Sequence, residues 1–241
     1  MWGHPTPVAV RSLLARLYFV WTISVGVVAS VLLVVPVVLA NVLRPSARTF
    51  WRSMRVWCRS IFSLCGLRVE ARGRAPEGPA VFVANHQGMI DIPVLLLGID
   101  QPFVFVARKE IRRVPIVGAV LRWSRCVLID RRAAGPGLAE AAQRVADGDS
   151  VLMFPEGTRS YGAGVAPFKT GAFRLAAAAG VPVVPVAVEG AAAAINEREK
   201  AGRPGTVRVC VGPPLDPLSD EPPAAWAERA RGTLLDLMPD T

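Results

Sequence analysis

A histidine and an aspartate five residues apart are the most chemically suggestive pair in this 241-residue chain. They are His86 and Asp91, and the only other histidine, His4, lies in a Pro-rich N-terminal leader. A neutral imidazole can accept a proton near pH 7, and a nearby carboxylate can fix its tautomer and stabilise the imidazolium. The pair is therefore a candidate general base that activates a hydroxyl group. The alternative is that Asp91 only caps a helix and His86 is a hydrogen-bonded turn residue.

A second polar segment, residues 154–160 (Phe-Pro-Glu-Gly-Thr-Arg-Ser), follows an apolar, strand-like run. Gly157 permits close backbone approach, and the Arg159 guanidinium is a planar fork that matches phosphate. Thr158 adds a hydroxyl donor, and Glu156 could pair with Arg159 or hold the amides of the loop. The segment is thus a candidate phosphate site, with a turn and a local ion pair as the alternative.

Further cations stand beside apolar runs. Arg108 and Lys109 directly follow the run at 103–107, where two adjacent cations could clamp a phosphate. Lys169 lies near the expected start of a helix, a position at which anions bind well. The alternative for the Arg108–Lys109 pair is a solvated surface cluster.

The elements that must position these residues fall in 67–241, which we expect to form one catalytic domain. Strand-like runs alternate there with helical stretches, and a final helix is expected near 224–238. This alternation predicts an α/β fold with a mixed, largely parallel central sheet flanked by helices. The expected strands are 67–71, 80–84, 103–107, 126–129, 151–154, 183–188 and 206–211. The expected helices between them are 89–97, 115–123, 137–147 and 168–179.

Residues 1–66 are expected to anchor the chain to a membrane. The run at 17–43 carries no charge, and as a helix it is long enough to cross a hydrocarbon core of about 30 Å, with a kink expected at Pro36. More arginines follow this run than precede it, which predicts that the rest of the chain lies in the cytoplasm. A cleaved signal peptide and a helical hairpin lying in one leaflet are the alternatives.

The next segment, 44–67, predicts a basic amphipathic helix. Its arginines recur at helical spacing along one stripe, and bulky apolar residues follow the same rhythm on another. This pattern is typical of an interfacial helix on anionic lipid. The alternative is a helix packed on the domain with solvated arginines. The two stripes are Arg44, Arg48, Arg52, Arg55 and Arg59, and Phe50, Met54, Trp57 and Ile61.

The overall composition narrows the class of partner. The net charge is +9, and 52% of the residues are hydrophobic, which suits an anionic partner such as an acidic membrane surface, a phosphorylated small molecule or nucleic acid. The arginines concentrate beside the apolar segment and do not interleave with base-stacking aromatics, so nucleic-acid binding is not expected. The spacing of the four cysteines and two histidines fits no metal template, so no metal is expected.

Together these motifs resemble the glycerolipid acyltransferase superfamily, close to its bacterial 1-acyl-glycerol-3-phosphate acyltransferases. Asn85, His86 and Asp91 match the family's Asn-His-x-x-x-x-Asp, and 154–160 matches its Phe-Pro-Glu-Gly-Thr-Arg-Ser block at every position. The segment 181–186 matches a later Val-Pro-Val-Val-Pro-Val block.

The family's Lys-x-Glu-Leu block is matched only loosely. It corresponds to Arg108-Lys-Glu-Ile111, followed by Pro115 and Gly118 and closed by Ile129-Asp-Arg131. Arg108 stands where the family usually has Lys, which keeps the charge and alters its shape.

The resemblance implies a direct acyl transfer. His86 would be the general base on the sn-2 hydroxyl of 1-acyl-glycerol 3-phosphate, with Asp91 orienting it and acyl-CoA or acyl-carrier protein as donor co-substrate; no cofactor is implied. The product would be phosphatidic acid, made at the cytoplasmic face of the inner membrane among membrane phospholipids. Another acceptor for the same chemistry, or a non-catalytic lipid-binding protein, are the alternatives. The substrate-binding residues would be Arg108, Lys109, Glu156, Gly157, Thr158, Arg159 and Lys169.

Overall fold

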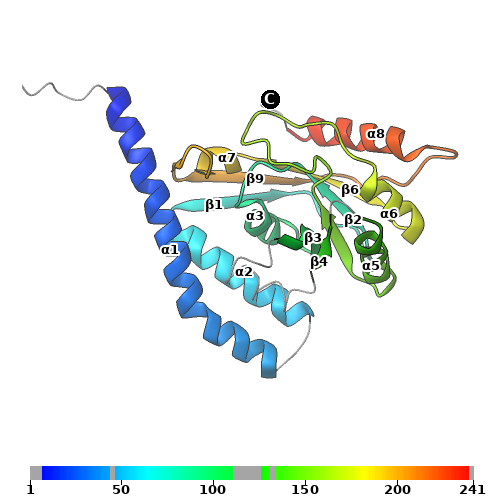
Figure 1. Cartoon of the computed structure of the whole chain (residues 1–241), viewed down its shortest axis with the longest axis horizontal. Coiled ribbons are helices and arrows are strands. Elements are labelled where there is room, and N and C mark those ends of the chain that lie inside the picture. Colours follow the sequence, from blue (N-terminus) through cyan, green and yellow to red (C-terminus); the bar gives the residue numbers. More distant parts are fainter. Residues whose placement is uncertain (1–6, 44–46, 111–125, 131–133, 239–241) are drawn as a thin grey trace, which may run out of the picture.

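The computed structural model describes residues 7–43, 47–110, 126–130 and 134–238, and its centre is one seven-stranded sheet (Figure 1). The strand order is β1-β9-β6-β2-β5-β3-β4, and every neighbouring pair is parallel except β6 and β9. The predicted mixed, largely parallel sheet is therefore confirmed. The strands are β1 (Leu67–Arg72), β2 (Val81–Ala84), β3 (Phe103–Arg108), β4 (Val127–Ile129), β5 (Ser150–Met153), β6 (Val183–Glu189) and β9 (Gly205–Val211).

Helices cover both faces of the sheet because the central strands are apolar on both sides. Alternate residues of β2 show this division: Phe82 packs in the cluster that contains residues of α2 and α3, whereas Val81 and Val83 pack with residues of α5, α6 and α8. The helices are α1 (Pro7–Leu43), α2 (Ala47–Leu64), α3 (Asp91–Gly98), α5 (Ala134–Ala146), α6 (Gly171–Ala179), α7 (Ala191–Ala194) and α8 (Pro223–Asp236).

The helix expected at 115–123 lies outside the described residues, so that prediction is not tested. The segment after β6 contains α7 and a small hairpin of β7 (Ile195–Asn196) and β8 (Ala201–Gly202), none of which the sequence pattern predicts. These elements are too short for hydrophobic periodicity to reveal them.

The amphipathic helix α2 packs its apolar stripe on the domain. Met54, Cys58 and Ile61 are buried in the same cluster as residues of α3 and the sheet, as the alternative interpretation predicts. Arg55 also faces inward, and its guanidinium donates to the carbonyls of Leu96 and Ile99 at the end of α3, at 2.6 and 2.9 Å. A charged donor at a helix C-terminus satisfies carbonyls that the helix itself leaves without partners.

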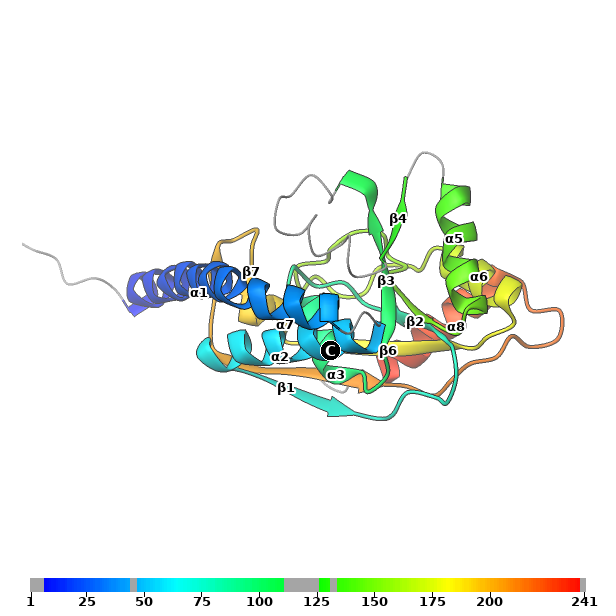
Figure 2. The same ribbon diagram turned by 90° about the horizontal axis from the view of Figure 1, so that it is seen from below.

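The long helix α1 lies along the side of the domain, next to α2 (Figure 1 and Figure 2). Within it, Val10–Leu32 is long and apolar enough to cross a membrane, and most of its large apolar side chains are exposed. One stripe of the same stretch contacts the domain: Thr22 and Ala29 are buried, and the Tyr18 hydroxyl donates to the Cys65 carbonyl at 2.8 Å. The helix thus has a protein-facing side and an exposed apolar side.

Candidate active site

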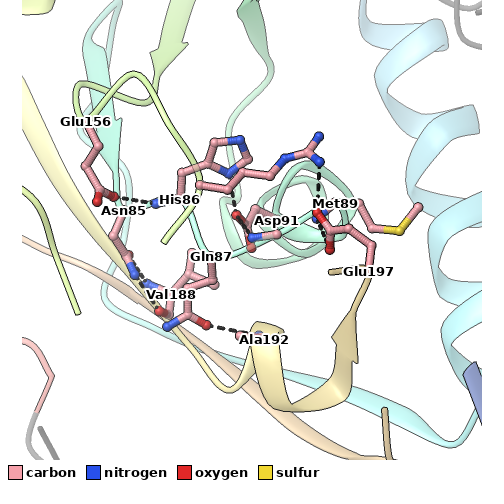
Figure 3. A network of polar contacts seen from close by, with 11 residues as sticks. Asn85, His86, Gln87, Met89, Asp91, Glu156, Val188, Ala192 and Glu197 are labelled. Atoms are coloured by element: carbon pink, nitrogen blue, oxygen red, sulfur yellow. Dashed lines mark hydrogen bonds and ion pairs between the residues drawn. The ribbon is translucent and has the colours of Figure 1, made fainter. Parts of the chain in front are cut away.

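The candidate base His86 and its partner Asp91 meet at the carboxyl end of β2. The turn after β2 carries His86, and α3 begins at Asp91, whose carboxylate folds back on the turn. The His86 Nδ1 lies 2.6 Å from the Asp91 Oδ2, which also accepts from the Gly88 amide at 2.8 Å (Figure 3). Because Asp91 accepts at Nδ1, the neutral imidazole carries its proton there, and its Nε2 is the atom that can take a second proton.

Neighbouring residues fix the imidazole in place. The Asn85 side chain accepts from the Val188 amide at 2.7 Å and donates to its carbonyl at 2.8 Å, which extends the pairing of β2 and β6 by one residue (Figure 3). The Phe154 ring stacks on the imidazole with centroids 4.0 Å apart. Asp91 is fully buried, whereas 18% of the His86 side chain is exposed. The base is therefore held rigidly and remains accessible.

Glu156 connects this turn to the second polar segment. Its carboxylate accepts from the His86 amide at 2.7 Å and from the Ala166 amide at 2.9 Å, and the residue is only 4% exposed. Burial raises the pKa of the carboxyl, and the two amide hydrogen bonds oppose that shift. Glu156 thus joins the turn that carries His86 to the loop at Ala166, and its predicted contact with substrate stays a prediction.

The rest of the second segment presents cations on the surface. Gly157 has a φ of +70°, and a Cβ placed there would lie 2.6 Å from the Lys169 ammonium nitrogen, so the glycine lets the lysine lie close against the backbone. Thr158, Arg159 and Lys169 are all exposed. Gly157 and Lys169, twelve positions apart in sequence, are thus brought together, and phosphate binding by this segment stays a prediction.

The Arg108–Lys109 pair lies two strands away from His86 at the same edge of the sheet. Arg108 ends β3, and the parallel strands β2, β5 and β3 place their carboxyl ends together. Lys109 forms an ion pair with Asp130, which follows β4. The side chain of Arg108 lies outside the described residues, so its predicted contact with substrate stays a prediction.

One residue at the site has no counterpart in the sequence analysis. Glu197 comes from the β7–β8 hairpin, and its Oε1 accepts from the Arg159 Nη1 at 2.8 Å. Its Oε2 accepts from the Met89 amide at 3.4 Å, in the turn between His86 and Asp91, which we call the catalytic turn after its predicted role (Figure 3). No local spacing signals this contact, because an Asn-Glu-Arg-Glu-Lys stretch looks like any solvated turn.

Cysteine thiolates and metal ions are two other kinds of group that can take part in catalysis. Burial raises the pKa of the Cys58 and Cys126 thiols to about 12, so neither supplies a thiolate at neutral pH. Among the residues with described positions, no group of three or more His, Cys, Asp or Glu side chains could hold a metal ion. The described residues therefore place a candidate general base, His86, near the exposed side chain of Arg159.

Comparisons with known proteins agree with this arrangement. A family model described as Acyltransferase matches residues 66–189. A 1-acyl-sn-glycerol-3-phosphate acyltransferase from Chlamydomonas reinhardtii is 34% identical over 88% of this chain and 67% of its own length. The Escherichia coli protein of the same name is 39% identical over 64% of each chain. The chain therefore spans about two thirds of the length of the curated relatives it matches.

A solved structure extends the similarity to nearly the whole fold. The crystal structure of the 1-acyl-sn-glycerophosphate acyltransferase PlsC from Thermotoga maritima matches with a TM-score of 0.75 at 25% identity, covering 94% of this chain and 95% of the other. The family model covers more than half of the chain and includes both His86 and Arg159. The chain belongs to the Acyltransferase family.

Proposed function

We propose that this chain transfers an acyl group from a thioester donor to the free hydroxyl of 1-acyl-glycerol 3-phosphate, giving phosphatidic acid. One observation carries the proposal: the accessible imidazole of the His86–Asp91 pair lies beside the loop that contains Arg159, because the next residue along donates its amide to the His86 carbonyl at 2.7 Å, and the Lys169 ammonium lies against Gly157 of the same loop. This arrangement supports the proposal, because an imidazole can deprotonate a hydroxyl while neighbouring cations bind a phosphate monoester. The names of the relatives support the same acceptor.

The reaction needs one base and no covalent enzyme intermediate. The His86 Nε2 accepts the proton of the acceptor hydroxyl while the oxygen attacks the thioester carbonyl. The tetrahedral intermediate collapses, the carbon–sulfur bond breaks, and the leaving thiolate takes the proton back from the imidazolium. Asp91 stabilises that imidazolium during the step and keeps the ring in its productive tautomer.

The acceptor's phosphate is held by the second polar segment. Arg159 offers a planar fork of donors, and Lys169 adds a point charge beside Gly157. Glu156 keeps this loop attached to the catalytic turn through the His86 amide. Lys109 and Arg108 are proposed to assist from the end of β3. The donor is proposed to be acyl-CoA or acyl-carrier protein, which serves as co-substrate without a bound cofactor.

We also propose that α1 lies in one leaflet of the membrane. The stretch Val10–Leu32 would have to cross the hydrocarbon core, yet Tyr18 and Thr22 within it contact the domain. A fully spanning α1 would draw the charged β7–β8 hairpin into the bilayer, which is costly. The exposed apolar side of α1 instead enters the cytoplasmic leaflet of the inner membrane. Exposed arginines of α2, such as Arg52 and Arg59, then face anionic phospholipid head groups.

Acceptor competition tests the function. The full chain is incubated with radiolabelled acyl-CoA and equal amounts of 1-acyl-glycerol 3-phosphate, glycerol 3-phosphate and a zwitterionic lysophospholipid. The 1-acyl-glycerol 3-phosphate is expected to receive most of the label. Arg159→Ala should raise its KM, whereas Arg174→Ala, on the exposed side of α6, should leave the KM unchanged. Equal labelling of the zwitterionic lipid would contradict the proposed acceptor.

A further inference from the structure

A carboxylate stands among the cations that are proposed to bind phosphate. Glu197 reaches the site from the β7–β8 hairpin, 38 residues beyond Arg159, and accepts from its guanidinium at 2.8 Å. Its side chain is 19% exposed, compared with 39% for that of Arg159. A negative charge beside an anion site requires an explanation, because it either competes with the phosphate or prepares the arginine for it.

The hairpin that carries Glu197 is fixed at several points. The Asn196 side chain accepts from the Arg198 and Glu199 amides, both at 3.1 Å, which closes the turn around Glu197. The Arg203 amide donates to the Ala194 carbonyl at 3.1 Å and closes the base of the hairpin. At Gly202 the hairpin also lies against the Tyr18 ring of α1. Glu197 is therefore presented by a rigid backbone.

Arg159, by contrast, is the adjustable partner of the pair. Its side chain is long and more exposed, and fixing such a side chain at the moment of binding costs conformational entropy. The hydrogen bond to Glu197 uses one terminal nitrogen, Nη1, and a guanidinium has further donors that can serve a phosphate. A preorganised arginine binds its ligand more tightly than a mobile one.

We infer that Glu197 is a positioning residue that holds the Arg159 guanidinium beside the catalytic turn, ready for the phosphate of the acceptor. The inference rests on the proposed function. The second carboxylate oxygen faces the Met89 amide, so the same residue sets the distance between the arginine and the turn that carries His86. Glu197 thereby contributes to the selectivity for a phosphate monoester over an acceptor that lacks one.

The test combines kinetics with binding in the absence of donor. Variants Glu197→Ala, Glu197→Gln and Glu199→Ala are assayed for kcat and KM with 1-acyl-glycerol 3-phosphate, and for its Kd by calorimetry in detergent. Glu197→Ala is expected to raise KM and Kd by about tenfold, with kcat changed by less than about twofold. Glu197→Gln retains an oxygen acceptor for Arg159 and should recover most of the affinity. Glu199→Ala, on the same hairpin, should behave like the wild type.

A double-mutant cycle shows whether Glu197 affects substrate affinity through Arg159. In an Arg159→Ala background, Glu197→Ala should cause no further loss of affinity. Two results with an active wild type would overturn the positioning role. One is a KM for Glu197→Ala that is lower than or equal to that of the wild type. The other is a loss of affinity on Glu197→Ala that is equally large when Arg159 is already Ala. A wild-type chain that neither binds nor acylates 1-acyl-glycerol 3-phosphate would instead overturn the proposed function, and the role of Glu197 with it.

Discussion

Replacing Asp91 by Asn separates the chemistry of the His86–Asp91 pair from its packing. The side chains have nearly the same volume, and Asp91 is fully buried at the start of α3. The Asp91 Oδ2 accepts from the Gly88 amide at 2.8 Å and also lies 2.6 Å from the His86 Nδ1, so an asparagine must place a single atom where Oδ2 now serves both. If its oxygen lies there, the ring keeps its tautomer but the imidazolium loses its negative partner. If its amide nitrogen lies there, it donates to Nδ1, and the Nε2 then carries the proton and can no longer accept one.

The expected loss follows from the role assigned to the pair. General-base catalysis contributes roughly 10²- to 10⁴-fold, and losing either the negative partner or the correct tautomer weakens it while leaving substrate binding intact. At 1.36 kcal/mol for each factor of ten, the barrier should rise by about 2.7 to 5.4 kcal/mol. The KM for the acceptor should change little, because Asp91 lies behind the imidazole and His86 separates it from the phosphate site. The effect should therefore appear in kcat.

The assay is acyl transfer from acyl-CoA to 1-acyl-glycerol 3-phosphate, with circular dichroism to confirm that the variant folds. Asp100→Asn is the matched control, because Asp100 also accepts from a backbone amide, that of Ala75 at 3.0 Å, and has no histidine partner. A folded Asp91→Asn variant with wild-type kcat would refute the role assigned to Asp91. An equal loss in Asp100→Asn would show that the assay reports stability.

Two further predictions concern stability. Arg55→Met should lower the free energy of unfolding by about 1.5 to 3 kcal/mol, because two carbonyls at the end of α3 lose a charged donor. Arg59→Met, on the exposed side of α2, is the control. Equal thermal midpoints of unfolding in the two variants would contradict the role assigned to Arg55. Burial raises the pKa of Glu156, so the folded chain binds this proton more tightly than the unfolded chain, and the stability linked to it is lost as the pH rises above about 4.5. Lowering the pH from 7 toward 4.5 should therefore stabilise the wild type relative to Glu156→Gln in chemical denaturation, and the opposite trend would count against the assigned burial.

The central sheet was accessible from sequence because its strands are short apolar runs separated by helical stretches. Each of the seven expected strands overlaps an observed one, and the turn that carries His86 follows β2 as expected. Whether the apolar stripe of α2 packs on lipid or on protein could not be predicted in the same way. An apolar stripe at helical spacing has the same pattern whether it packs on lipid or on protein, and only the position of α3 and the sheet decides between them.

The candidate site shows a similar division. The residue types and order within 154–160 indicate an anion site, and the sequence also allows Glu156 to hold the loop's amides, which is what the structure shows. The contact between Arg159 and Glu197 could not be predicted, because it joins segments 38 residues apart through a hairpin too short to leave a periodic signal. Long-range pairs of this kind depend on the path of the chain.

The most direct test of the central claim is acyl transfer to 1-acyl-glycerol 3-phosphate by the wild type and by His86→Ala, measured side by side in liposomes. The account predicts phosphatidic acid from the wild type and a loss of at least about a hundredfold in the variant, because the base that deprotonates the acceptor is gone. Equal rates in the two proteins would contradict the role of His86 on which the account depends.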